Sequence, residues 1–185
     1  MREGRRELRR RLRAARRAVP DAERPAAARA IDRALAGLGL PRPGTRVSAF
    51  LPFDGEIDPA GFLRRARALG CRVYFPVVTS LRNRRMRFVM DPGRPGRDAI
   101  GPRWLHLVIV PLVGFDDRGH RLGMGAGLYD RHFGFLRHRR AWRRPLLIGV
   151  AFEAQKVRRL AEAAHDVQLD GVVTERGVYG RVAAR

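Results

Sequence analysis

A glycine-rich segment contains the residues best suited to chemistry in this sequence. Residues 114–131 (GFDDRGHRLGMGAGLYDR) have glycine at the alternate positions 123, 125 and 127. Glycine leaves backbone N–H groups unshielded and tolerates positive φ, and the N-terminus of a following helix would attract an anion. Arg121 and Arg131 add guanidinium groups suited to phosphate. We therefore predict a phosphate-binding loop, with an ordinary glycine turn as the alternative. The spacing matches neither a P-loop nor a Rossmann motif.

Four carboxylates are candidates for metal or substrate binding. Asp58 precedes Pro59 and is expected to cap a helix, whereas Glu56 has no such local role. Asp130 follows the glycines directly, where it would hold Mg²⁺ against a phosphate or only complement the helix dipole. Asp166 is a candidate for a second Mg²⁺ ligand, with a turn residue as the alternative.

The N-terminal segment offers a second possible anion site. Residues 2–17 predict a helix with two leucines along its apolar face. At about 100° per residue, Arg5, Arg9 and Arg16 lie beside that face. Arginines four positions apart repel one another, so a phosphate shared by Arg5 and Arg9 would be stabilising. A solvated basic face without a ligand is the alternative.

The predicted strands and helices alternate along the chain. Leu107–Pro111 is almost wholly apolar, which is typical of a strand covered on both faces. The glycine segment follows this strand, at the edge where open α/β sheets bind ligands. The pattern therefore predicts an α/β fold with a mostly parallel sheet. The predicted helices are 2–17, 21–38, 58–69 and 127–139, and the predicted strands are 46–50, 72–76, 86–89, 107–111, 146–152 and 171–174.

The composition indicates one globular domain spanning residues 1–185. The chain has 185 residues, of which 45% are hydrophobic, and this length suffices for a core without disulfides. The single Cys71 excludes a disulfide framework and a cysteine-based zinc site. No apolar run approaches the roughly 20 residues of a membrane span, and no apolar stretch follows the basic N-terminus as in a secretory signal. We expect a cytoplasmic protein that does not bind membranes.

The net charge of +21 leaves two interpretations open. A strongly basic chain favours nucleic acid as a partner. However, Lys156 is the only lysine among 39 basic residues, and alanine, glycine and proline are abundant. That pattern is equally typical of a biased composition, so the charge alone does not assign a partner.

Taken together, these motifs resemble the 5-formyltetrahydrofolate cyclo-ligase family, also called methenyltetrahydrofolate synthetases. The resemblance covers nearly the whole chain. Its most specific part is the string RLGMGAGLYDR that ends at Arg131. The other matching pieces are, in order, the basic segment around residues 5–9, then 51–59, 108–114, 148–155 and 165–175.

The resemblance implies an enzyme with two small-molecule substrates, ATP and a reduced folate. Members convert 5-formyltetrahydrofolate to 5,10-methenyltetrahydrofolate with Mg²⁺, releasing ADP and phosphate. The formyl oxygen attacks the γ-phosphate, and the folate N10 then displaces phosphate as the ring closes. Phosphoryl transfer depends on positioned cations more than on a nucleophilic side chain. The resemblance also implies a single three-layer α/β/α domain, and we expect a monomer that does not bind nucleic acid.

The resemblance also assigns residues. Arg121 and Tyr129 would take part in catalysis, and Asp130 and Asp166 would hold Mg²⁺. The implied ATP contacts are Arg5, Arg9, Arg121, Leu122, Gly123, Met124, Gly125, Ala126, Gly127, Leu128 and Tyr129. The implied folate contacts are Leu51, Glu56, Met124, Gly125, Ala126, Gly127 and Leu128.

Two other functions are compatible with the sequence. The first is a basic protein that binds RNA or the ribosome, although no aromatic ribonucleoprotein motif is present. The second is a family member that binds nucleotide or folate without turnover. Leu128 in place of a tyrosine and a short 91–103 segment motivate this second alternative. Trp104 follows that segment and is expected in the core.

Overall fold

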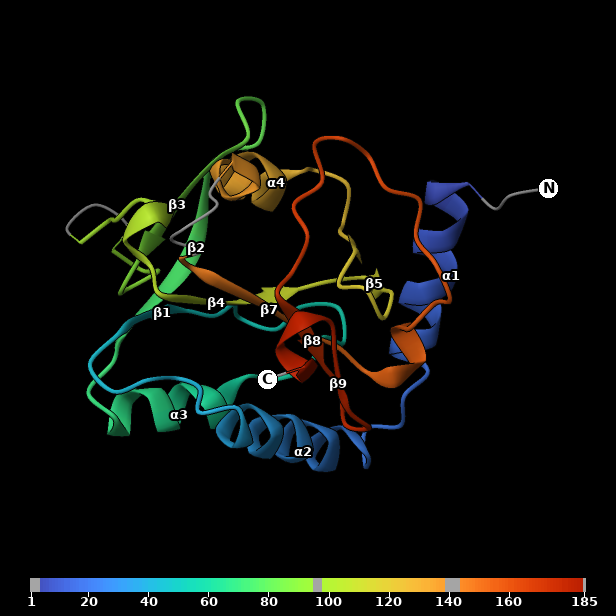
Figure 1. Cartoon of the computed structure of the whole chain (residues 1–185), viewed down its shortest axis with the longest axis horizontal. Coiled ribbons are helices and arrows are strands. Elements are labelled where there is room, and N and C mark those ends of the chain that lie inside the picture. The colour runs from blue at the N-terminus through green and yellow to red at the C-terminus, as the bar shows by residue number, and fades with distance from the viewer. Residues whose placement is uncertain (1–3, 95–97, 139–143, 185) are drawn as a thin grey trace.

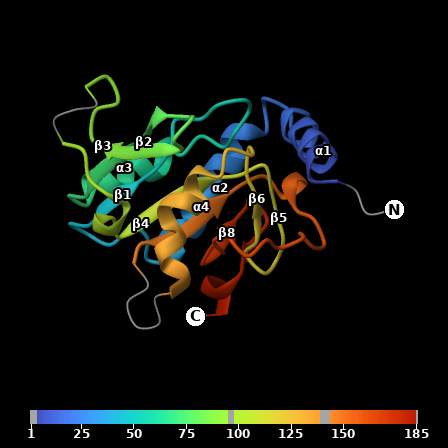
Figure 2. The ribbon, with the colours of Figure 1, turned by 90° about the horizontal axis from the view of Figure 1, so that it is seen from above.

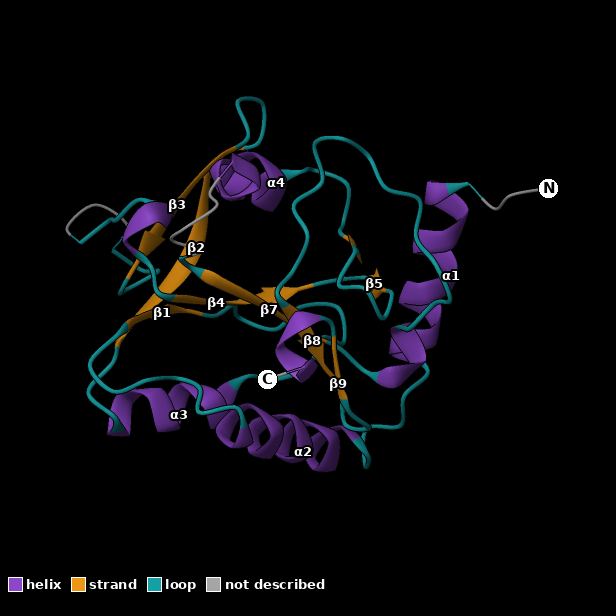
Figure 3. Ribbon diagram, viewed as in Figure 1, coloured by secondary structure: helices purple, strands orange, loops and turns teal. Residues whose placement is uncertain are grey.

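A seven-stranded sheet forms the centre of the computed structural model, which describes residues 4–94, 98–138 and 144–184 (Figures 1 and 3). The strand order is β3-β2-β1-β4-β7-β8-β9. The five inner strands pair in parallel, and β3 and β9 are antiparallel edges. The predicted α/β fold with a mostly parallel sheet is confirmed. The strands are β1 (Arg46–Ser48), β2 (Arg72–Ser80), β3 (Arg85–Val89), β4 (Leu107–Pro111), β5 (Gly114–Phe115), β6 (Arg121–Leu122), β7 (Leu146–Val150), β8 (Gly171–Val173) and β9 (Val178–Tyr179).

Two helices cover one face of the sheet and one short helix covers the other (Figures 1 and 2). The α-helices are α1 (Arg5–Arg17), α2 (Arg24–Gly37), α3 (Ala60–Ala68) and α4 (Leu128–Phe133). The 3₁₀ turns are η1 (Pro102–Trp104), η2 (Gly134–His138), η3 (Glu153–Gln155) and η4 (Arg181–Ala184). The apolar faces of α2 and α3 pack on alternate residues of β1, β4 and β7, including Val47, Ile109 and Ile148.

The opposite layer is thin. Phe133 of α4 packs over Val108 and Val110 of β4, and Val167 and Leu169 from a coil segment complete the cover. The antiparallel hairpin β5–β6 extends from the end of β4. Helix α1 lies at the side of the sheet, next to β5 and η3 (Figure 1). Three layers therefore result, and α4 and η2 are described helices of the second outer layer.

Several details differ from the sequence predictions, among them that β2 continues to Ser80 and that α2 begins at Arg24. The helix predicted to run to Arg139 ends at Phe133 and continues as the 3₁₀ turn η2, because Gly134 is a poor helix former; Arg139 itself lies outside the described residues, as do residues 2 and 3 of the first predicted helix. Strand β9 and the hairpin β5–β6 were not predicted, since strands of two residues have no readable alternation. Trp104 is 63% exposed rather than in the core.

No helix in the described part of the chain is long and apolar enough to span a membrane.

Candidate active site

A cavity of about 390 Å³ opens beside the carboxyl end of β4, and residues of α1 and of the start of α4 line it. Its walls come from α1, the loop after β1, the end of β4, the glycine segment and residues 165 and 166. The lining residues are Arg5, Arg9, Glu56, Pro111, Leu112, Arg121, Gly123, Met124, Gly125, Ala126, Gly127, Leu128, Tyr129, Asp130, His165 and Asp166.

The glycine segment has the backbone conformation that its sequence predicts. Gly125 has φ of +109° and Gly127 has φ of +63°, which L-residues with a side chain rarely adopt. Gly127 is the residue directly before α4, so the left-handed turn directs the chain into the helix. Because α4 has only six residues, its dipole is weaker than that of the longer helix predicted here. Backbone N–H groups and arginines are therefore the groups of this cavity that are best suited to attract an anion.

Arg121 forms the buried base of the cavity. Its side chain is 6% exposed, and one guanidinium nitrogen donates to Asp130 Oδ1 at 2.5 Å. The other donates to the Val167 carbonyl, and the Val167 N–H in turn donates to Asp130 Oδ1 at 3.0 Å. Burial lowers the pKa of Arg121, and the Asp130 carboxylate opposes that shift. Arg121, Asp130 and the 167 backbone thus form one fixed unit.

Helix α1 brings two more arginines to the cavity. Arg5 donates to Asp166 Oδ2 at 3.2 Å, and Arg9 Nε donates to the Gly123 carbonyl at 2.9 Å. The helix approaches this closely because it packs on a glycine: a Cβ at Gly114 would lie 2.3 Å from Leu12 Cδ1. The two cavity-facing arginines are the pair that the sequence predicts beside the apolar face.

Arg16, the third arginine beside that face, has a different role from the predicted one. Its side chain is 1% exposed and donates to Asp54 Oδ2 at 2.7 Å. It is not a cavity-lining residue, and its guanidinium is enclosed by carboxylates rather than open to a phosphate. Arg16 therefore lies out of reach of a phosphate in the cavity, because the 54–56 loop packs on this part of α1.

Glu56 lines the same cavity as the glycine segment. Its Oε2 accepts from the Phe53 N–H at 3.1 Å, and its Oε1 lies 3.4 Å from Arg16. Burial raises the pKa of Glu56, against the Phe53 N–H and Arg16, which lower it. Asp58 accepts from the Ala60 N–H at 2.9 Å, so its carboxylate caps the start of α3, although the N-cap position itself is occupied by Pro59 rather than Asp58. The structure thus separates a capping role for Asp58 from a cavity position for Glu56.

Tyr129 lies between the cavity and the core. Its ring stacks on Phe133 with centroids 6.0 Å apart. Burial raises the pKa of the Tyr129 hydroxyl, and Arg121 opposes that shift. The hydroxyl therefore stays protonated at neutral pH and is available as a hydrogen-bond donor within the cavity.

Three residues expected at the site lie outside the cavity. Arg131, which was predicted to bind phosphate beside Arg121, is exposed and does not line the cavity. Leu51 is 61% exposed, and Leu122 is fully buried in a cluster with Leu12 and Leu160. Any contact of Leu122 with a ligand would have to come from its backbone. Conversely, Pro111, Leu112 and His165 line the cavity and were not predicted. Pro111 and Leu112 follow the rule that ligands bind at the carboxyl ends of parallel strands, which could have identified them.

Asp130 and Asp166 line the same cavity and are its candidate metal ligands. Within the described ranges, no group of three or more His, Cys, Asp or Glu side chains could hold a metal ion. Two carboxylates fit Mg²⁺, which keeps several waters and is usually bound by one or two carboxylates together with substrate phosphates. The donor set therefore fits a cation shared with a phosphate ligand.

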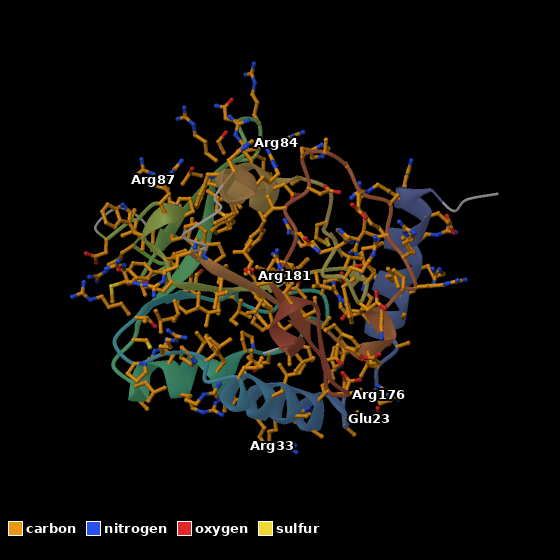
Figure 4. All side chains as sticks on the ribbon, in the orientation of Figure 1. Glu23, Arg33, Arg84, Arg87, Arg176 and Arg181 are labelled. Atoms are coloured by element: carbon orange, nitrogen blue, oxygen red, sulfur yellow. The ribbon has the colours of Figure 1, made fainter. Side chains whose placement is uncertain are left out.

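Most arginines lie away from the cavity. Figure 4 shows Arg84 and Arg87 near β3 and, on the opposite side of the molecule, Arg33 on α2 and Arg176 before β9. All four are exposed. The positive charge thus surrounds the molecule instead of forming one patch.

The fold and the cavity define a class, namely the α/β proteins that bind ligands at the carboxyl ends of an open, mostly parallel sheet. Residues 1–175 match the family described as 5-formyltetrahydrofolate cyclo-ligase. The chain belongs to this enzyme family, as its resemblance predicts.

Individual relatives agree with this membership. The chain is 32% identical to the 5-formyltetrahydrofolate cyclo-ligase of Escherichia coli (strain K12) over 148 residues, covering 72% of this chain and 79% of that protein. It is 30% identical over 181 residues to the enzyme of the same name from Mycolicibacterium smegmatis, covering 88% and 90%. Among solved structures, the 5,10-methenyltetrahydrofolate synthetase from Mycoplasma pneumoniae matches with a TM-score of 0.78 and 26% identity, covering 94% of this chain and 99% of that one.

Proposed function

We propose that this protein converts 5-formyltetrahydrofolate to 5,10-methenyltetrahydrofolate, with ATP as co-substrate and Mg²⁺ as cofactor. The observation that carries the proposal is one cavity lined by three arginines, the glycine segment, two aspartates and the partly buried Glu56. In a member of this enzyme family, these groups supply both a polyphosphate site and a site for a polar heterocycle.

The arginines would bind the triphosphate. Arg5 and Arg9 approach from α1, and Arg121 from the buried base, so the cations surround the glycine N–H groups. Negative charge spreads over the oxygens of a phosphoryl group in transfer, and fixed cations stabilise it without a nucleophilic side chain. The backbone from residue 122 to 129 would complete the ATP contacts.

Asp130 and Asp166 would hold Mg²⁺. When bound, the ion would neutralise charge on the phosphates and orient them. The carboxylate of Asp166 would then leave its pair with Arg5, which is free to turn to the phosphate because it is 39% exposed.

Glu56 would bind the folate near its reacting end, since a carboxylate accepts hydrogen bonds from the N–H groups of a reduced pterin ring. Residues 124–128 would contact the folate from the opposite wall, and the exposed Leu51 would cover it from outside the cavity. The formyl oxygen would attack the γ-phosphorus and release ADP. N10 would then attack the formyl carbon, the C–O bond would break to release phosphate, and the N10 proton would be lost as the ring closes.

An absorbance assay tests the proposal. Purified protein with Mg-ATP and 5-formyltetrahydrofolate is expected to raise the near-UV absorbance as the methenyl product forms, with one ADP per product. Omission of ATP is the control. Folded protein that shows ligand-induced melting shifts but no methenyl product would instead support binding without turnover. Sub-micromolar RNA binding that falls steeply with salt, with no product formed, would support the RNA-binding alternative.

A further inference from the structure

Arg16 is the most deeply buried charged side chain near the cavity, yet it does not line it. It lies in the second half of α1 and is 1% exposed. A guanidinium group without a partner at such a position would cost several kcal/mol, because water no longer solvates it. Its surroundings must therefore supply negative charge, and two carboxylates of the 54–56 loop do so.

The two ends of the Arg16 fork have different partners. One nitrogen donates to Asp54 Oδ2 at 2.7 Å. The other lies 3.4 Å from Glu56 Oε1 and 3.5 Å from the Leu112 carbonyl. Glu56 and Leu112 both line the cavity. Arg16 therefore contacts two wall residues of the cavity from behind.

Asp54 fixes the first end. It has φ of +56°, an uncommon conformation for a residue other than glycine, and its carboxylate accepts from Arg13, Arg16 and Arg17. Burial disfavours the ionised form, but these three arginines lower the pKa of Asp54 to about 2. Asp54 is thus a permanent anion that holds the Arg16 guanidinium in one place on α1.

We propose that Arg16 is a positioning residue for the folate: it fixes the orientation of the Glu56 carboxylate toward the cavity. This inference rests on the proposed function, in which Glu56 binds the folate. The Phe53 N–H holds one carboxylate oxygen and Arg16 contacts the other, so both oxygens have defined places before a substrate arrives. Pre-organisation of this kind lowers the entropic cost of binding.

The charges around Glu56 are consistent with this role. Arg16 of α1 lowers the pKa of Glu56, and Asp54 of the same loop as Glu56 raises it. The charge of Glu56 in turn raises the pKa of Tyr129 in α4. Arg5 and Arg9 of α1 and Arg121 of β6 line the same cavity. Of these, Arg16 is the group that makes direct contact with the carboxylate among the described residues.

Arg17 provides a matched control. It also donates to Asp54 from α1, but it is exposed and does not contact Glu56. Arg17→Met therefore removes one cation from Asp54 without touching the cavity wall. Arg16→Lys is the conservative variant, because one ammonium can bind Asp54 but cannot span both carboxylates as a fork does.

A double-mutant cycle on binding tests the proposal. Calorimetry on the full chain would measure Kd for 5-formyltetrahydrofolate and, separately, for Mg-ATP, so that turnover is not needed. Arg16→Met is expected to raise the folate Kd about tenfold and to leave the Mg-ATP Kd within about twofold. Arg16→Lys should lie between Arg16→Met and wild type, and Arg17→Met should match wild type. In a Glu56→Gln background, Arg16→Met should have almost no further effect on the folate Kd.

Several results would overturn the inference. One is an Arg16→Met effect on the folate Kd that persists in the Glu56→Gln background, and another is an equal loss of Mg-ATP affinity in Arg16→Met. Normal folate binding by Glu56→Gln, or no folate binding by wild type, would also overturn it. If Arg16→Met does not fold, Arg16→Lys and its cycle with Glu56→Gln decide in the same way. The proposed function fails by a different result, the absence of methenyl product in the absorbance assay.

Discussion

Two arginine–aspartate pairs at the cavity have the same chemistry but different surroundings. Arg121–Asp130 is short, at 2.5 Å, and its arginine is buried. Arg5–Asp166 is longer, at 3.2 Å, and its arginine is the more exposed of the two, at 39%. A buried pair is costly to break, because one charge is left without a partner or water. An exposed pair contributes little to stability and exchanges partners easily.

This difference indicates how a site can be both rigid and responsive. Both members of the buried pair are hydrogen-bonded to the backbone of Val167. The pair therefore fixes the geometry of the cavity floor before a ligand binds. The exposed pair joins α1 to the segment carrying Asp166 and is the one able to rearrange. Changing each aspartate in turn should therefore separate the two roles.

Asp130→Asn is expected to have the largest effect. It removes the counter-charge of Arg121 as well as a proposed metal ligand. We expect turnover to fall by a factor of about 1000 and the free energy of unfolding to fall by about 3 kcal/mol. Urea denaturation and the absorbance assay measure the two effects. Unchanged stability would show that the buried pair is not a structural unit.

Asp166→Asn is expected to affect function without a large effect on stability. The exposed pair contributes less than about 1 kcal/mol, and the amide oxygen can still accept from the Ala163 N–H, which lies 3.0 Å from Asp166 Oδ2. Turnover should fall about 100-fold, and the Mg²⁺ concentration for half-maximal activity should rise. Asp21→Asn, which breaks an exposed pair with Arg24 remote from the cavity, is the control. An unchanged Mg²⁺ dependence in Asp166→Asn would remove this residue from the metal site.

Local sequence carried enough information to predict the parts of the site that depend on backbone chemistry. Gly125 and Gly127 adopt positive φ as their residue type predicts, and the apolar Leu107–Pro111 strand is buried at the centre of the sheet. Helical periodicity also placed Arg5 and Arg9 correctly beside the apolar face of α1, from where both line the cavity. These features need only the residue type and its immediate neighbours.

The parts that could not be predicted depend on partners distant in sequence. Periodicity correctly placed Arg16 beside the apolar face of α1, but only the fold shows that Asp54 packs there. Leu122 was expected at the ligand because it lies in the glycine segment, yet the two-residue strand β6 turns it into the core. The overestimated length of α4 is an exception with a local cause, because Gly134 is a poor helix former and the chain continues there as the 3₁₀ turn η2.

A third arginine-bound carboxylate, Asp54, extends the comparison outside the cavity, and its substitution is expected to have the smallest effect on turnover. Its pKa of about 2 lies below the ordinary value of 3.8. A carboxyl group whose pKa is lowered by folding stabilises the folded state above its ordinary pKa, and this contribution is lost as the pH falls toward the folded value. The contribution of Asp54 should therefore be complete above about pH 4 and disappear toward about pH 2.

Urea denaturation of wild type and Asp54→Asn between neutral and acid pH checks this effect. The variant should be less stable near pH 6, because Arg16 loses its main counter-charge. The difference should narrow between about pH 4 and pH 2, where the wild-type carboxylate becomes protonated. Subtracting the two free energies of unfolding cancels the contributions of the other carboxylates, because these titrate alike in both proteins. A stability difference that stays constant over this range would mean that the three arginines do not stabilise the ionised form of Asp54. Packing alone would then hold the Arg16 guanidinium in place.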